Sequence, residues 1–203
     1  MEKILVWDWP VRIGHWLMVG AFVLAWITGD SETWRLVHVF AGGTLVGVIL
    51  FRVLWGLIGS RHARFGSFVR GPGHVIGYLK SLLTSHPAHA TGHNPAGGWA
   101  IVALLALGLF SGVTGWLTYQ DIAPKIFEEL HEGLTSLMLA VVVVHLAGVL
   151  VGSLAHRENL PRAMITGMKL GKAGEAITSA RAWAVPLLLG CTAACAWWLA
   201  RAG

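Results

Sequence analysis

The chain has 203 residues, of which 55% are apolar and only 12% charged, and its mean hydropathy is +0.65. Soluble domains carry about 25% charged residues, so this composition argues against an ordinary water-soluble protein and favours a protein of the lipid bilayer. The net charge is +5, but the basic residues gather in particular loops, which indicates membrane topology and argues against nucleic-acid binding.

Five stretches are apolar and long enough to cross a bilayer, whose hydrocarbon core takes about 20 residues of helix. Asp8 and Pro10 supply a cap and an early-turn proline for the first helix. We predict an all-α membrane protein, with a four-helix bundle in residues 1–170 and a linker and fifth transmembrane helix in residues 171–203. The expected spans are residues 11–29, 35–58, 98–118, 130–154 and 182–200.

Lysine and arginine are distributed unequally between the two sides of these spans. Most lie in the N-terminal segment and in the 59–97 and 155–181 connections, and the other side has only Arg35, Lys125 and Arg201. Because basic loops stay in the cytoplasm, we expect a cytoplasmic N-terminus and an outer C-terminus. The outer side is also acidic, which would favour a basic partner. Within the 59–97 connection, "VIGYLKSLL" is typical of a short interfacial helix.

Four histidines fall within the predicted spans, where ionisable residues are costly and indicate function. His15 lies in the first span, His38 in the second, and His131 and His145 in the fourth. Fourteen residues at 100° each leave His131 and His145 about 40° apart around the helix and about 21 Å apart along it. One metal ion cannot bind both, so each is expected to bind a separate large cofactor.

Depth in the bilayer predicts how the histidines pair. His38 and His131 lie near the outer side, whereas His15 and His145 lie toward the cytoplasmic side. Facing imidazoles in a helical bundle are typical axial ligands of b-type haem, and iron with both axial positions filled favours electron transfer. We expect two non-covalent haem b groups, because no C-x-x-C-H motif occurs. His156, about 20° from His145 around the helix, is the alternative inner ligand.

Each ligating histidine has a second ring nitrogen, which we expect to donate to a backbone carbonyl one turn earlier. Gly42 and Gly133 would leave room for a flat macrocycle, with helix packing as the alternative. Arg12, Arg35 and Arg52 lie at helix ends, where they would pair with haem propionates or anchor the helices at the bilayer surface. Gly14, Gly43 and Gly47 have the same two possible roles as Gly42 and Gly133, namely space for a macrocycle or helix packing.

Three more histidines, His86, His89 and His93, lie in one Pro-, Gly- and Ala-rich tract. Their spacing raises the alternative of a metal cluster. No carboxylate or cysteine completes the cluster, so we expect a solvated loop.

Several segments carry a family resemblance. They are "WDWPVRIGHW", "HVFAGGTLVGVILFRVLWGLIG", "GHNPAGGW", "LHEGL…VVVVHLAG" and "HRENLPRAMITGMK". Together they resemble the bacterial cytochrome b561-like membrane cytochromes, especially the cytochrome b subunit of nickel–iron hydrogenases. The resemblance covers about residues 5–170 and leaves the fifth helix outside.

The resemblance implies a four-helix di-haem core in the bacterial inner membrane, with His15, His38, His131 and His145 as axial ligands. It also implies electron exchange between the quinone pool and a periplasmic redox protein, either a hydrogenase small subunit or a c-type cytochrome. A quinone site is expected near the cytoplasmic haem, with Arg12, His93 and Asn94 as the candidates on that side.

Three other functions stay open from the sequence. Relatives of this kind include self-contained quinone-linked oxidoreductases such as superoxide oxidases. A histidine-based membrane transporter is a second alternative, although mid-span carboxylates typical of such relays are lacking. A haemless assembly or anchor subunit is the third.

Overall fold

The computed structural model describes residues 2–84 and 87–201, so His86 of the candidate loop cluster lies outside the described residues. Five helices in the described part are long and apolar enough to span a membrane, which confirms the predicted all-α membrane class. They are α1 (Trp9–Thr28), α2 (Arg35–Ile58), α5 (Pro95–Tyr119), α6 (Pro124–His156) and α8 (Val185–Arg201).

Polar caps explain where two of these helices begin. The Oδ1 atom of Asp8 accepts the Val11 N–H at 2.9 Å, and Asn94 Oδ1 accepts the Gly97 N–H at 2.7 Å. Such caps satisfy backbone donors that have no partner inside the helix. The second oxygen of the fully buried Asp8 accepts the Trp55 Nε1–H at 2.9 Å. This carboxylate therefore starts α1 and also ties it to α2.

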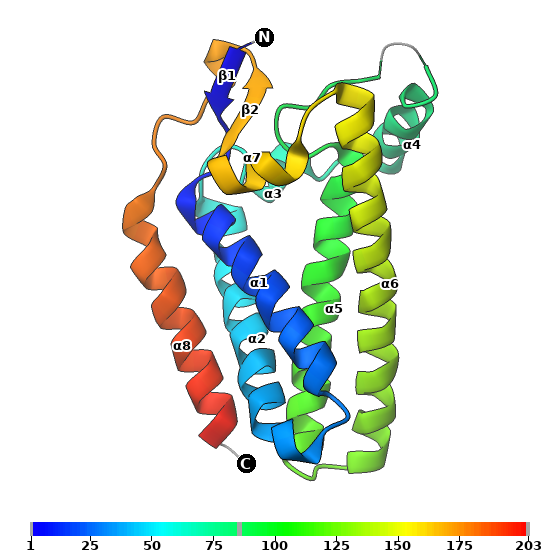
Figure 1. Ribbon diagram of the computed structural model, residues 1–203, viewed down its shortest axis with the longest axis vertical. Helices are drawn as coiled ribbons and strands as arrows, with labels where there is room; N and C mark the ends of the chain where they lie inside the picture. The colour runs from blue at the N-terminus through cyan, green and yellow to red at the C-terminus, as the bar shows by residue number, and fades with distance from the viewer. Residues whose placement is uncertain (1, 85–86, 202–203) are drawn as a thin grey trace.

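Shorter elements gather at one end of the bundle (Figure 1). They include α3 (Phe65–Phe68), α4 (Pro72–Ser81) and α7 (Leu160–Thr166), with the antiparallel strands β1 (Glu2–Leu5) and β2 (Met168–Gly171). The helix α4 covers most of "VIGYLKSLL". The 3-10 turns are η1 (Glu32–Trp34), η2 (Ala173–Glu175) and η3 (Ala182–Ala184). The strand pair was not expected from the sequence, and it fixes the N-terminus to the segment that follows α7.

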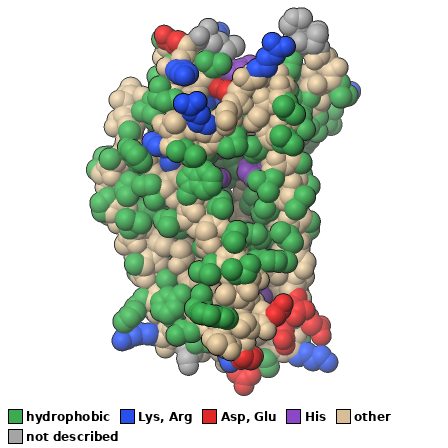
Figure 2. All heavy atoms as spheres, in the orientation of Figure 1, with side chains coloured by type: hydrophobic (Ala, Val, Ile, Leu, Met, Phe, Trp, Pro, Cys, Tyr) green, Lys and Arg blue, Asp and Glu red, His purple; other side chains and the backbone are tan. Residues whose placement is uncertain are grey.

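The two ends of the bundle differ in charge. Figure 2 shows lysine and arginine side chains gathered at the end that carries the strand pair, and mostly acidic side chains at the other. We call these the basic end and the acidic end. The segments 59–84, 87–94 and 157–181 lie at the basic end, and the α1–α2 and α5–α6 turns lie at the acidic end. The basic loops therefore share one side, as the positive-inside argument requires.

The long helices form two pairs, α1 with α2 and α5 with α6, which meet where α2 contacts α5. Within the described residues, α6 packs on α5 and α7 but makes no extended contact with α1 or α2. Halfway along, one apolar cluster draws on all four helices. It consists of Ala21, Leu45, Ile49, Leu105 and Met138. The two pairs are thus joined at mid-depth by side chains from all four helices.

The fifth helix, α8, packs along α2 (Figure 1). A Cβ atom on Gly43 would lie 2.7 Å from the Cα of Ala196, and one on Gly47 would lie 2.7 Å from the Cα of Thr192. Backbone atoms cannot retreat from such contacts, so these two glycines serve helix packing. Of the two roles considered for Gly43 and Gly47, the structure supports helix packing and not space for a cofactor.

Candidate functional site

The imidazoles of His38 and His131 face each other near the acidic end. Their ring centroids are 6.0 Å apart and their planes are inclined by 80°. The Nδ1 atom of His38 lies 2.9 Å from the Ala25 carbonyl oxygen of α1, and Nδ1 of His131 lies 2.9 Å from the Ser111 carbonyl oxygen of α5. Carbonyls only accept, so both Nδ1 atoms carry the hydrogen. Each Nε2 then keeps a lone pair for a metal.

These hydrogen bonds correct the expectation that the acceptor lies one turn earlier on the same helix. For His38 and His131 that expectation is wrong, because the acceptors are carbonyls of neighbouring helices. Carbonyls within a helix already accept the bond from four residues further on. Interhelical bonds instead fix each ring relative to a second helix, which orients it more firmly.

The spacing of this pair fits an iron between two imidazoles. Metal-bound histidine nitrogens lie roughly 2 Å from the metal, which sets facing ring centroids roughly 6 Å apart. The observed separation of 6.0 Å agrees with that arrangement. The side of α2 that carries His38 also leaves room for a flat macrocycle. A Cβ on Gly42, four residues after His38, would meet no atom within 4 Å apart from the backbone of its own helix.

Two further glycines near this pair differ in role. A Cβ on Gly115 of α5 would lie 2.8 Å from Cε1 of His131, so the glycine lets that ring reach the Ser111 carbonyl. Gly133 also has open space around it, but it is exposed and lies two residues after His131. Two residues turn a helix by about 200°, so Gly133 faces away from the pair. The structure does not bring it to the candidate haem site.

His15 and His145 lie nearer the basic end, on α1 and α6. The two imidazoles are close enough to interact electrostatically, and the Nδ1 atom of His15 is buried without a hydrogen-bond partner. The alternative ligand His156 instead faces His89, with ring centroids 5.6 Å apart. The structure thus brings His145 toward His15, and it places His156 at the basic rim.

An apolar layer lies between the two histidine pairs. Met138 lies seven residues from both His131 and His145, and it is buried with Ile49 and Leu105 in the mid-depth cluster. Because this apolar cluster lies between His131 and His145 along α6, the histidines form two separate groups, one toward each end of the bundle.

Arg52 has no hydrogen-bond partner for either terminal nitrogen, although it is only 7% exposed. It lies over the rings of Phe65 and Phe68 at 5.2 and 5.9 Å, and it interacts electrostatically with Asp8. A buried guanidinium without hydrogen-bond partners is costly. An anionic group at this position would satisfy it, and a haem propionate is such a group.

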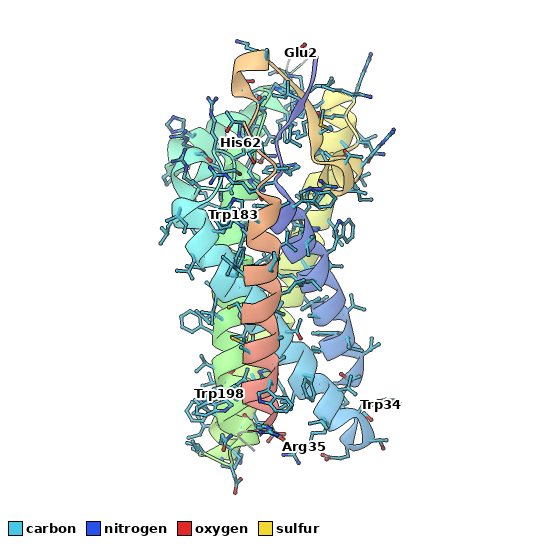
Figure 3. All side chains as sticks on the ribbon, turned by 90° about the vertical axis from the view of Figure 1, so that its left-hand side faces the viewer. Glu2, Trp34, Arg35, His62, Trp183 and Trp198 are labelled. Atoms are coloured by element: carbon cyan, nitrogen blue, oxygen red, sulfur yellow. The ribbon has the colours of Figure 1, made fainter. Side chains whose placement is uncertain are left out.

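The other two candidate arginines are differently placed. Arg12 stacks on Trp9, with its guanidinium carbon 4.0 Å from the ring centroid, and donates from Nη2 to the Ile165 carbonyl. Its Nε is buried without a partner. Arg35 is exposed at the acidic end (Figure 3) and lies 5.2 Å from the ring of Tyr119.

Of the three candidate quinone residues, His93 alone lines a cavity of about 680 Å³ at the basic end. Its ring lies 4.4 Å from that of Trp7 and 4.7 Å from that of Phe68, and its Nδ1 is buried without a partner. Burial, and secondarily the nearby Arg52, hold the pKa of His93 well below its ordinary value. The structure does not bring Arg12 and Asn94 to this cavity, since the first binds α7 and the second caps α5.

His89 and His93 line the same cavity, but their rings have different partners. His89 faces His156, whereas His93 packs between the rings of Trp7 and Phe68. In the part of the chain that the structure describes, no three His, Cys, Asp or Glu side chains are arranged to hold a metal ion. Sequence reasoning missed the groups that orient the imidazoles of His38 and His131, namely the Ala25 and Ser111 carbonyls and Gly115. Only the packing of neighbouring helices brings these groups to the histidines.

Residues 6–167 match the protein family described as prokaryotic cytochrome b561. The chain is 24% identical to a probable Ni/Fe-hydrogenase B-type cytochrome subunit of Rhizobium leguminosarum bv. viciae, over 84% of this chain and 90% of that protein. It is 27% identical to the probable Ni/Fe-hydrogenase 1 B-type cytochrome subunit of Escherichia coli (strain K12), over 57% and 60%. A probable Ni/Fe-hydrogenase B-type cytochrome subunit of Azotobacter vinelandii is 28% identical, over 58% and 60%.

The chain therefore spans about 60% of the length of the second and third of these relatives. No solved structure matches it. The family match includes α1, α2, α5 and α6 with all four histidines of the two pairs. The chain belongs to the prokaryotic cytochrome b561 family, whose b-type cytochromes carry haem b.

Proposed function

We propose that the protein is a di-haem b-type cytochrome of the bacterial inner membrane that carries electrons between the quinone pool and a periplasmic redox protein. The observation that carries this proposal is the facing pair His38 and His131, with each Nδ1 bound to a carbonyl and each Nε2 left for a metal. Two neutral imidazoles that face each other between helices are typical ligands of haem iron, and no carboxylate or thiolate that would complete a zinc site is arranged beside them in the described residues.

The four histidines have matched roles in this proposal. His38 and His131 hold one iron toward the acidic end, and His15 and His145 hold the other toward the basic end. Haem held by these residues would supply one-electron oxidation and reduction. His131 and His145 lie about 21 Å apart along the axis of α6. Electron transfer between haems at these two depths would cross most of a hydrocarbon core about 30 Å thick.

Arg52 is the leading candidate for binding a haem propionate at the basic end. Its two unpartnered terminal nitrogens would bind a propionate carboxylate and stabilise the haem that His15 and His145 hold. Arg12 and Arg35 are the weaker propionate candidates, because each already has a partner: Arg12 binds the Ile165 carbonyl and Arg35 stacks on Tyr119.

The quinone would bind near the basic end, which we assign to the cytoplasm by its excess of lysine and arginine. His93 supports this placement, because its buried ring nitrogen lacks a partner and the residue interacts electrostatically with His145. A ring nitrogen of this kind would bind a quinone carbonyl or hydroxyl. Arg12 and Asn94 would then act through the helix ends that they fix.

The periplasmic partner would dock at the acidic end. Its exposed carboxylates favour a basic surface on the partner and speed the encounter. These carboxylates are Asp30, Glu32, Asp121, Glu128, Glu129 and Glu132. The names of the relatives support a hydrogenase as that partner, which we take to dock through its small subunit. A c-type cytochrome with a basic surface would meet the same electrostatic requirement.

The test is electron flow across a sealed bilayer. The haem-loaded protein is placed in vesicles that contain ferricyanide, and a membrane-soluble quinol is added outside. Each quinol gives two electrons and two protons, so it reduces two ferricyanide ions. We expect flow well above that of empty vesicles, lost in His131→Ala and in His15→Ala, and kept in the exposed control Arg162→Ala. Flow equal to that of empty vesicles, or unaffected by both histidine changes, would overturn the proposal.

A further inference from the structure

A second cavity, of about 450 Å³, opens at the basic end between the end of α2 and the segment that precedes α8. Three arginines line it, Arg61, Arg64 and Arg181, and no acidic residue is among its described lining residues. In contrast, the larger cavity beside His93 includes Glu175 in its lining. Glu175, which lies between the lining residues Gly174 and Ala176, interacts electrostatically with Arg61, so it offsets part of the charge of one arginine. Three guanidinium groups against this one carboxylate still leave the smaller cavity positive.

A buried hydroxyl also points to a missing partner in this cavity. Ser60 lines it, is only 4% exposed, and its Oγ has no hydrogen-bond partner. Buried polar side chains are nearly always hydrogen-bonded, and an orphaned one indicates a group that the chain alone does not supply. Because a hydroxyl beside three guanidinium groups would donate to an anion, that group is expected to be an oxyanion.

The arginines retain donors for such an anion. Arg61 donates from Nη1 to the Gly174 carbonyl at 2.9 Å, which fixes its direction and leaves its other N–H groups available. In the described residues, none of the three has a carboxylate within ion-pair distance. The carboxyl end of α2 carries a partial negative charge that opposes an anion. Binding must therefore depend on these arginines, whose planar donors match a phosphate.

An apolar strip leads away from the cavity along the helices. Ile58 lines the cavity and is 73% exposed, and Leu54 is exposed one turn earlier on α2. Trp183 is exposed in η3, directly before α8, at the same end of the molecule as His62 (Figure 3), and Leu187 follows on α8. A positive cavity that continues into an exposed apolar strip suits a molecule with an anionic head and a hydrocarbon tail.

We propose that this cavity binds the phosphate headgroup of an acidic phospholipid, with the acyl chains on the apolar strip of α2 and α8. The proposal does not depend on electron transfer, because none of the cavity residues belongs to either histidine pair. Such a lipid would fasten α8 to α2 at the basic end, where Arg181 comes directly before η3.

The experiment uses the full-length, haem-loaded protein, with lipids removed in detergent. Phosphatidylglycerol, phosphatidylcholine and inorganic phosphate are added separately, and binding is followed by native mass spectrometry and by the rise in Tm. We expect phosphatidylglycerol to bind and raise the Tm, and phosphatidylcholine to bind more weakly. Inorganic phosphate should bind far more weakly than phosphatidylglycerol, because it has no acyl chains to place on the apolar strip.

The variants separate this site from general surface charge. Ser60→Ala should weaken phosphatidylglycerol binding about tenfold, the usual loss for one hydrogen bond to a charged group, without lowering the Tm of the lipid-free protein. Arg64→Gln should also weaken it about tenfold, and the matched exposed control Arg162→Gln should not. Haem content should stay constant in all three, so failure here is distinguishable from failure of the proposed function.

Three results would overturn the proposal. Equal binding of phosphatidylglycerol and phosphatidylcholine would remove the role of the anionic headgroup. Equal weakening of phosphatidylglycerol binding by Arg64→Gln and Arg162→Gln would show that binding depends on general surface charge and not on this cavity. Inorganic phosphate that binds as tightly as phosphatidylglycerol and displaces it would assign the cavity to a free anion.

Discussion

Gly115→Ala perturbs one histidine of the candidate pair at the acidic end without removing it. The added Cβ would lie 2.8 Å from Cε1 and 3.0 Å from Nδ1 of His131, whereas ordinary van der Waals contact begins at 3.4 Å. The ring must therefore retreat by about half an ångström. Its hydrogen bond to the Ser111 carbonyl, now 2.9 Å long, lengthens with that movement.

The magnitude follows from two effects. Overpacking a well-filled site costs about 1–3 kcal/mol of folding stability. Loss of the hydrogen bond that orients a metal-binding histidine weakens metal affinity about 10–100-fold. We expect Gly115→Ala to fold, to hold the haem of the acidic end about 10–100-fold more weakly, and to leave the haem of the basic end unchanged.

The assay is the release of haem to an excess of a haem-scavenging protein, followed by the absorbance of the reduced cytochrome. Gly190→Ala on α8 is the control, because a Cβ there meets no atom within 4 Å. Equal release of both haems from Gly115→Ala, or release as slow as from the control, would refute the assignment of His131 as a ligand held by the Ser111 carbonyl.

Three further predictions concern the basic end. Arg52→Met removes a positive charge near the site of His15 and His145, so a redox titration should show a lower midpoint potential for that haem and no shift for the other. Trp55→Phe deletes the 2.9 Å bond to the buried Asp8 and should destabilise the protein by about 1–3 kcal/mol in thermal unfolding. Burial lowers the pKa of His62 below the ordinary 6.5, so the unfolded chain binds more protons in the window below 6.5. The contribution of His62 to the free energy of unfolding should be fully present above pH 6.5 and fall as the pH drops through that window. The fall should be less steep in His62→Gln than in the exposed control His74→Gln. Identical pH profiles of the two variants would contradict this.

Hydrophobic length and helical periodicity were enough to predict the five spans. They also place His131 and His145 on one face of the fourth long helix, because that relation depends only on the turn per residue. The start of α6 at Pro124 rather than at residue 130 was missed, since Glu128, Glu129 and Lys125 lower the hydropathy without breaking a helix.

Relations between helices could not be predicted in this way. The partners of the histidine Nδ1 atoms lie on other helices, and the strand pair joins residues more than 160 positions apart. Gly42 and Gly43 are adjacent in sequence, yet one faces open space and the other touches Ala196. Which side of α2 receives α8 depends on packing, and the local sequence carries no signal for it.

The central claim is that two haems are held by two specified histidine pairs. The most direct measurement is the haem-to-protein ratio and the redox-resolved difference spectrum of the purified protein and of four single variants, His15→Ala, His38→Ala, His131→Ala and His145→Ala. We predict two haems per chain, with one spectral component lost in both His38→Ala and His131→Ala and the other lost in both His15→Ala and His145→Ala. A protein without haem, or loss of the same component in His38→Ala and His15→Ala, would contradict the account.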